Sequence, residues 1–353
     1  MPGRARDHGI EIGLLPTGPD NAITDVPGVR VGHATVWRDE PDPPLGRGVA
    51  RTGVTAIVPG DALGVLRAPL PSGVAVLNGA GELTSSIQVR EWGVLETPIL
   101  LTSTMQVGRA LDGLVELLCE SDPTLGVGRV VIPMVGECDD SYLNDARRVQ
   151  IDVADVRKAV EEAHPGAVEE GAVGAGTGMV CFGCKGGIGT SSRLVSGPAD
   201  GLDATVGVLL LTNFGERRRL TIDGRAVGRW LDDKAPPEPS RVPAGSCIGV
   251  VATDAPCSPH QLERLARRTG LGLARCGSVA HHGSGEIFTA FSTTPAAGLR
   301  PLGDDRLNPL FAAVVEASEE AVLNSLAAAT TTTGAHGHTV EAVPIEQARA
   351  ALW

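Results

Sequence analysis

The junction between Gly245 and Ser246 is the segment of the sequence best suited to nucleophilic chemistry. A serine at a new chain N-terminus has its own α-amine, with an unperturbed pKa of about 7.7–8.0, as a base beside its hydroxyl. The hydroxyl can free that amine by attacking the preceding carbonyl, which gives an ester that water hydrolyses. Glycine suits the preceding position because it has no Cβ, tolerates strained backbone and leaves its carbonyl open to attack. The pair predicts self-cleavage, and the alternative is an ordinary turn from a loop into a strand.

The segments on either side of this junction differ sharply in composition. Residues 232–240 are charged and rich in proline, which predicts an exposed, flexible stretch. The apolar run 247–252 follows at once and predicts a core strand. Gly277-Ser278 and Gly283-Ser284 also occur, so the dipeptide alone is not diagnostic. The expected nucleophile therefore stands at the first residue of a strand.

Other motifs in the chain are incomplete. The glycine-rich stretch 171–189 has neither the spacing of a dinucleotide fingerprint nor a complete P-loop, because Cys184 precedes Lys185 where a P-loop needs glycine. These glycines are expected to allow close backbone approach. Cys181 and Cys184 lack a second pair at zinc-finger spacing, and the histidines show no ligand pattern. The sequence also has no Gly-x-Ser-x-Gly elbow. We therefore expect no metal and no cofactor.

The composition narrows the class of protein. The 353 residues carry 30 Lys and Arg against 42 Asp and Glu, a net charge of −12 without any basic run, which disfavours binding to nucleic acid or an anionic membrane. No apolar run has the length of a membrane span, and the N-terminus lacks a signal core. The seven cysteines are scattered through apolar segments and are expected to be reduced and buried. These features predict a soluble, acidic, cytoplasmic protein.

Strand-like and helix-like runs alternate along the chain. Strands are expected at 54–58, 74–77, 98–101, 129–133, 205–211, 247–252 and 287–291. Ser258-Pro259-His260-Gln261 is a capping box that predicts a helix, and Asn308-Pro309 and Asp152 are expected to begin two more. With no repeat and no clear domain break, this mixture predicts an α/β or α+β fold in which helices cover sheet faces.

Several segments together resemble the DmpA-like peptidases, the family of L-aminopeptidase/D-Ala-esterase/amidases and β-peptidyl aminopeptidases. The matching segments are Asn21-Ala22-Ile23-Thr24-Asp25-Val26-Pro27-Gly28-Val29, Val31-Gly32-His33, Gly79-Ala80-Gly81-Glu82, Leu101-Thr102-Ser103-Thr104, Gly136-Glu137-Cys138, Gly174 to Met179, Lys185 to Arg193, Thr212-Asn213-Phe214-Gly215, Gly245-Ser246, Ala252-Thr253-Asp254-Ala255-Pro256 and Ser284-Gly285-Glu286-Ile287. They occur in the family's order over nearly the whole chain.

The resemblance implies a four-layer αββα sandwich of the α+β class, similar to N-terminal-nucleophile hydrolases. It implies one domain, 1–353, that cleaves itself into chains 1–245 and 246–353, which stay together. It also implies a homo-oligomer, a tetramer or higher.

By the same resemblance Ser246 is both the self-cleaving residue and the mature nucleophile, with Ser284 and Glu286 as its partners. Two residues apart on an extended segment, Ser284 and Glu286 point the same way, so the carboxylate can orient the hydroxyl and stabilise a protonated amine. The alternative is that Glu286 is an exposed carboxylate at a strand edge.

The resemblance also gives roles to three residues outside the segments that contain Ser246 and Ser284. Asn213 ends an apolar strand and is expected to donate to the oxyanion, and the alternative is a turn asparagine before Phe214-Gly215. Tyr142, the only tyrosine, is expected to place its hydroxyl near that oxyanion, and the alternative is a half-buried packing residue. Glu137 is expected to bind the free amino group of the substrate. Asp139 stands where the family more often has asparagine, which bears on substrate preference.

The sequence therefore predicts a serine aminopeptidase that releases N-terminal residues from short peptides, amides or esters through an acyl-enzyme on Ser246. Its preference for L-α, D- or β-residues stays open. One alternative is an acyltransferase of the same fold that passes the acyl group to an amine. Another is a non-enzymatic, glycine-rich nucleotide-binding module, against which the incomplete P-loop argues.

Overall fold

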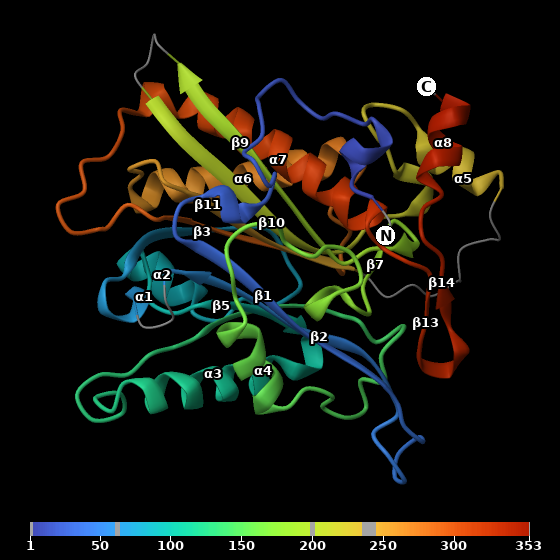
Figure 1. Ribbon diagram of the computed structural model, residues 1–353, viewed down its shortest axis with the longest axis horizontal. Helices are drawn as coiled ribbons and strands as arrows, with labels where there is room; N and C mark the ends of the chain where they lie inside the picture. The colour runs from blue at the N-terminus through green and yellow to red at the C-terminus, as the bar shows by residue number, and fades with distance from the viewer. Residues whose placement is uncertain (1–2, 61–63, 198–201, 235–244, 353) are drawn as a thin grey trace.

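Two β-sheets lie face to face between two layers of helices (Figure 1). The structure is a computed structural model that describes residues 3–60, 64–197, 202–234 and 245–352. The helices α6 and α7 cover one side of the sandwich, and α3 and α4 cover the opposite side (Figure 1). The expected αββα arrangement is thus confirmed.

The first sheet has four strands and includes the element that holds Glu137. Its strands are β1 (Val29–Asp39), β2 (Val49–Pro59), β5 (Ile99–Ser103) and β6 (Met134–Cys138), in the order β1-β2-β5-β6. The strand β6 runs parallel to β5, and the other neighbours are antiparallel. The helices α3 (Val107–Ser121) and α4 (Val153–Glu161) pack on its outer face. This sheet therefore forms one side of the space between the two sheets.

The second sheet has six strands and holds the predicted nucleophile. Its strands are β4 (Val94–Leu95), β3 (Leu70–Gly79), β12 (Gly285–Ser292), β11 (Ser246–Thr253), β10 (Leu202–Asn213) and β9 (Ile188–Gly197), in that spatial order. The strand β11 is parallel to β12 and antiparallel to β10. The helices α6 (Pro259–Arg275) and α7 (Asn308–Ala327) cover its outer face. The predicted nucleophile thus begins a central strand.

The space between the sheets is filled by aliphatic side chains. Ile248 and Val250 of β11 pack in one buried cluster with Leu101 of β5 and Met134 of β6. Strand residues alternate between the two faces, so the intervening residues of β11 face the helix layer. Burial on both faces explains why this strand reads as a continuous apolar run.

The remaining elements are short and connect the layers. They are α1 (Gly64–Arg67), α2 (Ser86–Trp92), α5 (Val227–Asp232), α8 (Ile345–Leu352), the hairpins β7 (Val180–Cys181) with β8 (Cys184–Lys185) and β13 (Thr332–Thr333) with β14 (Thr339–Val340), and the single-turn 3-10 helices Ala5–His8, Ile23–Asp25, Thr104–Gln106, Gly174–Gly176, Arg217–Arg219, Asp304–Leu307 and Ala335–Gly337. Most of the proline-rich stretch 232–240 lies outside the described residues.

The expected helices are confirmed. The Ser258 side chain accepts a hydrogen bond from the backbone of Gln261 at 3.3 Å, which forms the capping box at the start of α6. Pro309 occupies the first turn of α7, and Asp152 immediately precedes α4. Each of these helices packs an apolar face on a sheet.

Two expectations about the chain are corrected. The strand expected at 129–133 is wrong, because the strand begins at Met134, after Pro133, while Val130 and Ile132 are 80% and 50% exposed. The expectation that all seven cysteines are buried is wrong for Cys119, which is exposed. Cys181 and Cys184 face each other across the β7–β8 hairpin.

In the ranges that the structure describes, no helix combines the length and the apolar character needed to cross a bilayer.

Candidate active site

Strand register brings the predicted nucleophile and its partners together at one end of the second sheet. Ser246, the first residue of β11, pairs with Asn213, the last residue of β10. On the other side of β11, its next residue, Cys247, pairs with Glu286, the second residue of β12. Three adjacent strands therefore position the three side chains, and their backbone ladders fix the spacing.

The Ser246 hydroxyl lies in a nearly closed environment. The residue is 5% exposed, and its Oγ accepts a hydrogen bond from the backbone N–H of Gly285 at 3.1 Å. The preceding Gly245 lies against β10, where a Cβ would be 1.7 Å from the Asn213 carbonyl oxygen. That position therefore admits glycine and no larger residue without a backbone shift. The sequence argument expected a glycine here for its conformational freedom, and the structure adds this close approach.

Ser284 and Glu286 form a buried pair beside the nucleophile. The Ser284 hydroxyl donates to Oε1 of Glu286, while Oε2 of Glu286 is buried without a hydrogen-bond partner among the described residues. Burial raises the pKa of Glu286, and the hydrogen bond from Ser284 opposes that rise. The alternative of an exposed strand-edge carboxylate is wrong, because β12 is flanked by β3 and β11. The free oxygen is thus available to a cationic or hydrogen-bonding group.

Asn213 is held by both ends of its amide. Its Oδ1 accepts from the backbone N–H of Val180 at 2.8 Å, and its Nδ2 donates to the carbonyl oxygen of Asp139 at 2.9 Å. An amide nitrogen carries two hydrogens, so one donor of Nδ2 is left for another acceptor. The residue ends β10 within the ladder and is 4% exposed, so it is not the exposed turn asparagine of the alternative interpretation.

Glu137 comes from the opposite sheet, on β6. Its Oε1 accepts from the backbone N–H of Glu82 at 2.8 Å, and the Thr104 hydroxyl donates to its other oxygen. Burial raises its pKa, the two hydrogen bonds oppose that rise, and the negative charges of Asp139 and Glu82 add to it. A Cβ on Gly81 would lie 3.0 Å from Oε1 of Glu137 and 3.5 Å from the Cα of Gly285. Glu137 therefore faces the segment from Ser284 to Glu286, with Gly81 between them.

Tyr142 lies in the loop that follows β6. Its ring stacks on His338 with centroids 4.3 Å apart, and its carbonyl oxygen is 2.8 Å from Nδ1 of His338. Among the described residues, its hydroxyl has no hydrogen bond to Ser246 or Asn213. The structure therefore brings together Ser246, Asn213, Ser284 and Glu286, with Glu137 facing them, while Tyr142 packs against His338 and a small cluster that includes Val180.

The sequence analysis did not single out the residues that support these side chains. The Asn78 amide, opposite Glu286 on β3, donates to the carbonyl oxygens of Ser284 at 2.5 Å and His281 at 2.8 Å. This contact fixes the turn that leads into β12. Asn78-Gly79 at a strand end was the signal available for it. Thr104, which bonds Glu137, had no signal beyond its place in the family segment 101–104.

Lys185 anchors the glycine-rich stretch beneath Asn213. Its buried ammonium donates to the carbonyl oxygens of Gly186 at 2.7 Å, Met179 at 2.8 Å and Gly176 at 3.1 Å. Burial lowers the pKa of Lys185 to about 7. A Cβ on Gly187 would lie 1.9 Å from the Gly171 carbonyl oxygen, so the stretch needs glycine for close approach, as expected. Within this stretch, the backbone N–H of Val180 donates to Asn213.

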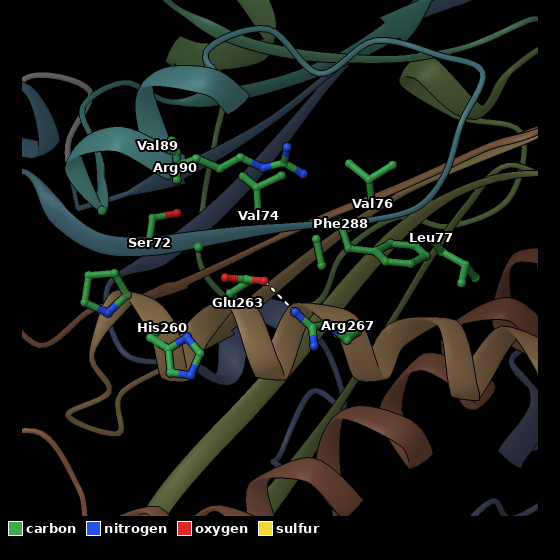
Figure 2. Close-up of a pocket in the computed structure, with 14 residues that line it drawn as sticks. Ser72, Val74, Val76, Leu77, Val89, Arg90, His260, Glu263, Arg267 and Phe288 are labelled. Atoms are coloured by element: carbon green, nitrogen blue, oxygen red, sulfur yellow. Dashed lines mark hydrogen bonds and ion pairs between the residues drawn. The ribbon is translucent and has the colours of Figure 1, made fainter.

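A separate hollow of about 610 Å³ lies between β3, α2 and α6 (Figure 2). Val74 and Val76 line it together with Glu263 and Arg267 of α6, which form an ion pair (Figure 2). None of the predicted site residues lines this hollow. The candidate active site is therefore identified by the convergence of strand ends and not by this cavity.

Comparisons with known proteins agree with this geometry. A family model described as peptidase family S58 matches residues 21–340. The beta-peptidyl aminopeptidase BapA of Sphingosinicella microcystinivorans is 39% identical over 370 residues, which cover 99% of this chain and 91% of BapA. These matches confirm the resemblance to the DmpA-like peptidases.

Two solved structures are similar over almost their whole length. A Burkholderia sp. beta-aminopeptidase has a TM-score of 0.90 and 40% identity, covering 99% of this chain and 98% of that one. The L-aminopeptidase D-Ala-esterase/amidase of Ochrobactrum anthropi, described as a prototype for the serine aminopeptidases and a new variant among the Ntn hydrolase fold, has a TM-score of 0.89 and 38% identity, covering 99% and 98%. The fold is therefore of the DmpA type.

Proposed function

The chain belongs to peptidase family S58 and is an aminopeptidase, and from that premise we propose that it is a self-processing serine enzyme with Ser246 as its nucleophile. The observation that carries this proposal is the strand register, which sets Asn213 beside Ser246 and Glu286 beside Cys247. The strands on either side of Ser246 thus supply an amide donor and a carboxylate, which are groups that acyl transfer requires.

The first step of the proposal is cleavage of the bond between Gly245 and Ser246. The Ser246 Oγ attacks the Gly245 carbonyl carbon, the C–N bond breaks, and the acyl group passes to oxygen as an ester while nitrogen becomes a free amine. Water then hydrolyses the ester and leaves a carboxylate on Gly245 and a hydroxyl on Ser246. The products are chains 1–245 and 246–353. The close packing of Gly245 on Asn213 supports this step, because it holds the carbonyl beside β10.

The freed amine then acts as the base for substrate cleavage. It takes the proton of Oγ as the oxygen attacks the substrate carbonyl, and it returns a proton to the leaving amine. The second hydrogen of Asn213 Nδ2 stabilises the oxyanion of the tetrahedral intermediate. Water hydrolyses the resulting acyl-enzyme and regenerates the Ser246 hydroxyl. Tyr142, expected near the oxyanion by resemblance, stays a prediction.

Glu286 has the part of stabilising the protonated amine. Its Oε1 is occupied by Ser284, and its Oε2 is buried without a partner among the described residues, on the strand next to the one that the new amine would begin. An ammonium group there would supply the missing contact and lower the cost of burying the carboxylate. Ser284 orients the carboxylate and is available to relay a proton.

Glu137 binds the free amino group of the substrate in this proposal. From the opposite sheet it faces the segment from Ser284 to Glu286, and its two hydrogen bonds orient the carboxylate. This contact would restrict the enzyme to short peptides, amides or esters with a free N-terminus. The related proteins described above carry names for β-peptidyl, L-amino acid and D-Ala substrates, and all three classes are candidates here.

We also propose a cytoplasmic location and a homo-oligomer for this chain.

The experiment compares two amides of the same amino acid, one with a free amine and one whose amine is acetylated. The wild-type protein should hydrolyse the free compound and leave the acetylated one intact, because only the former carries the charge that Glu137 binds. Ser246→Ala should lose activity, whereas Ser278→Ala, which changes the serine of another Gly-Ser pair, should keep it. Equal hydrolysis of both compounds, or an active Ser246→Ala protein, would refute the proposal.

A further inference from the structure

A hollow of about 490 Å³ opens beside Glu137 and suggests which substrates the site prefers. Thr104, Met105 and Asp139 line it on the side of the active site. The Thr104 hydroxyl is bonded to the Glu137 carboxylate, so the hollow adjoins the point where the substrate amine would bind. In an amino acid the side chain branches one or two carbons from that amine. The hollow is therefore placed to receive the side chain of the substrate's first residue.

Asp139 and Glu137 lie on the same side of the chain. They are two residues apart where β6 ends, and alternate residues of an extended segment point to one face. The negative charge of Asp139 is close enough to contribute to the raised pKa of Glu137. The two carboxylates therefore present two negative charges within reach of one bound residue.

Two other charged residues that line this hollow, Arg147 and Asp145, neutralise each other. Arg147 is paired with Asp145 at 2.6 Å and with Asp42 at 3.3 Å. The carboxylate of Asp139 accepts the backbone N–H of Ser141 at 2.9 Å, and within the described residues it has no cationic partner. The hollow thus offers one negative charge that no ion pair of the described residues neutralises.

An apolar side chain completes the surface. Met105 is 64% exposed at the rim of the hollow, next to Thr104. A flexible thioether of this kind packs well on the methylene stem of a long side chain. The hollow therefore combines an apolar rim with a charged wall.

We propose that this hollow selects substrates whose N-terminal residue carries a second cationic group at the end of an aliphatic stem. Glu137 binds the terminal amine, Asp139 binds the side-chain cation, and Met105 covers the stem. Lysine, ornithine and their β-homologues have this pattern. The proposal rests on the function proposed above and concerns which residue the enzyme prefers to release.

The test compares p-nitroanilides of lysine and norleucine, and of their β-homologues, because norleucine has the stem of lysine without the charge. The wild-type ratio of kcat/KM for lysine over norleucine should be about 10 or more, the size expected for one charge-assisted contact. Asp139→Asn should bring that ratio close to one. The ratio is the readout because any general loss through the Asp139 carbonyl and Asn213 affects both substrates equally.

Asp203→Asn is the matched control, because it removes one negative charge from the exposed far end of β10. It should leave the lysine preference intact. A wild-type ratio near one, or an unchanged ratio in Asp139→Asn, would overturn the proposal. Failure of the proposed function is distinguished from these results by the Ser246→Ala protein and the acetylated amide, or by a wild-type protein that hydrolyses none of the amides. Lysinamide and norleucinamide would in that case be compared as ligands by calorimetry, and equal affinities would also overturn the proposal.

Discussion

Asn213 and Ser246 are direct partners at the last rung of the ladder between β10 and β11. The same backbone pairing that builds the centre of the second sheet therefore sets an amide donor beside the proposed nucleophile. A slip of one residue in this register would turn every side chain of β11 to the opposite face. The two faces of β11 have different neighbours, because Ile248 and Val250 pack between the sheets whereas Cys247 and Val251 pack toward the helices, so a slip would move each set into surroundings that it does not fit. The packing of the core thus fixes the geometry of the site.

Loss of the Asn213 donor should reduce turnover. Asn213→Asp keeps an oxygen that accepts from Val180, but removes the NH₂ group and puts a negative charge where the oxyanion forms. We expect kcat to fall by about 10²–10³-fold, the size measured for single oxyanion donors in other enzymes, while KM changes little. Steady-state kinetics on a free amino-acid amide provides the measurement. An unchanged kcat would show that Asn213 does not stabilise the oxyanion.

Self-cleavage should depend on glycine at position 245. In Gly245→Ala the new Cβ would start 1.7 Å from the Asn213 carbonyl oxygen, so the backbone must move before the bond can be attacked. Strain of this kind costs about 1–3 kcal/mol, and we expect cleavage to slow at least about tenfold. Gly108→Ala in α3 is the control, because its Cβ would meet nothing within 4 Å. Gel electrophoresis after timed incubation measures both rates, and equal rates would contradict the prediction.

Much of the layer structure could be predicted from the sequence. The apolar runs 205–211, 247–252 and 287–291 lie within β10, β11 and β12, because central strands buried on both faces read as continuous aliphatic stretches. The capping box at Ser258 likewise fixed the start of α6, since side-chain capping is a local interaction. Positions of Ser246 and Asn213 at strand ends followed from the same runs.

The contacts between the sheets could not be predicted in this way. The bond from Thr104 to Glu137 and that from Asn213 to Asp139 join residues 33 and 74 positions apart. No local pattern encodes such pairings. The strand expected at 129–133 was wrong for a related reason: Val130 and Ile132 are apolar but exposed, and the chain pairs only after Pro133. The glycine at 245 was expected on chemical grounds, but its contact with Asn213 required the structure.

Glu286 should increase kcat/KM but lower the thermal stability of the protein at neutral pH. Glu286→Gln should lower kcat/KM by about 10²–10⁴-fold, the usual contribution of such a group. Burial raises the pKa of Glu286 in the folded protein. Above that pKa the side chain is ionised in the folded protein and lowers the free energy of unfolding. Below the unfolded value near 4.3 it is protonated in both states and has no such effect. In a Ser246→Ala background, which lacks the new amine, Glu286→Gln should raise the Tm at pH 7, and this gain should vanish near pH 4. A lower Tm at pH 7 would contradict this reasoning.

The affinity for amines should titrate with Glu137. Burial raises the pKa of this carboxyl, so competitive inhibition by an aliphatic primary amine should weaken as pH falls through a midpoint above the ordinary glutamate value. Thr104→Val removes a hydrogen bond that lowers this pKa, so the midpoint should move to higher pH. Inhibition constants measured from pH 4 to 8 give both midpoints. A midpoint that stays unchanged in Thr104→Val would exclude Glu137 as the titrating group.

The most direct measurement is the intact mass of the purified protein, with sequencing of its chain ends. We expect two chains of about 25 and 11 kDa, in proportion to residue number, the smaller beginning with Ser246, Cys247 and Ile248. Ser246→Ala should give one chain of 36.3 kDa. An uncut wild-type chain of that mass with full aminopeptidase activity would contradict the proposed mechanism.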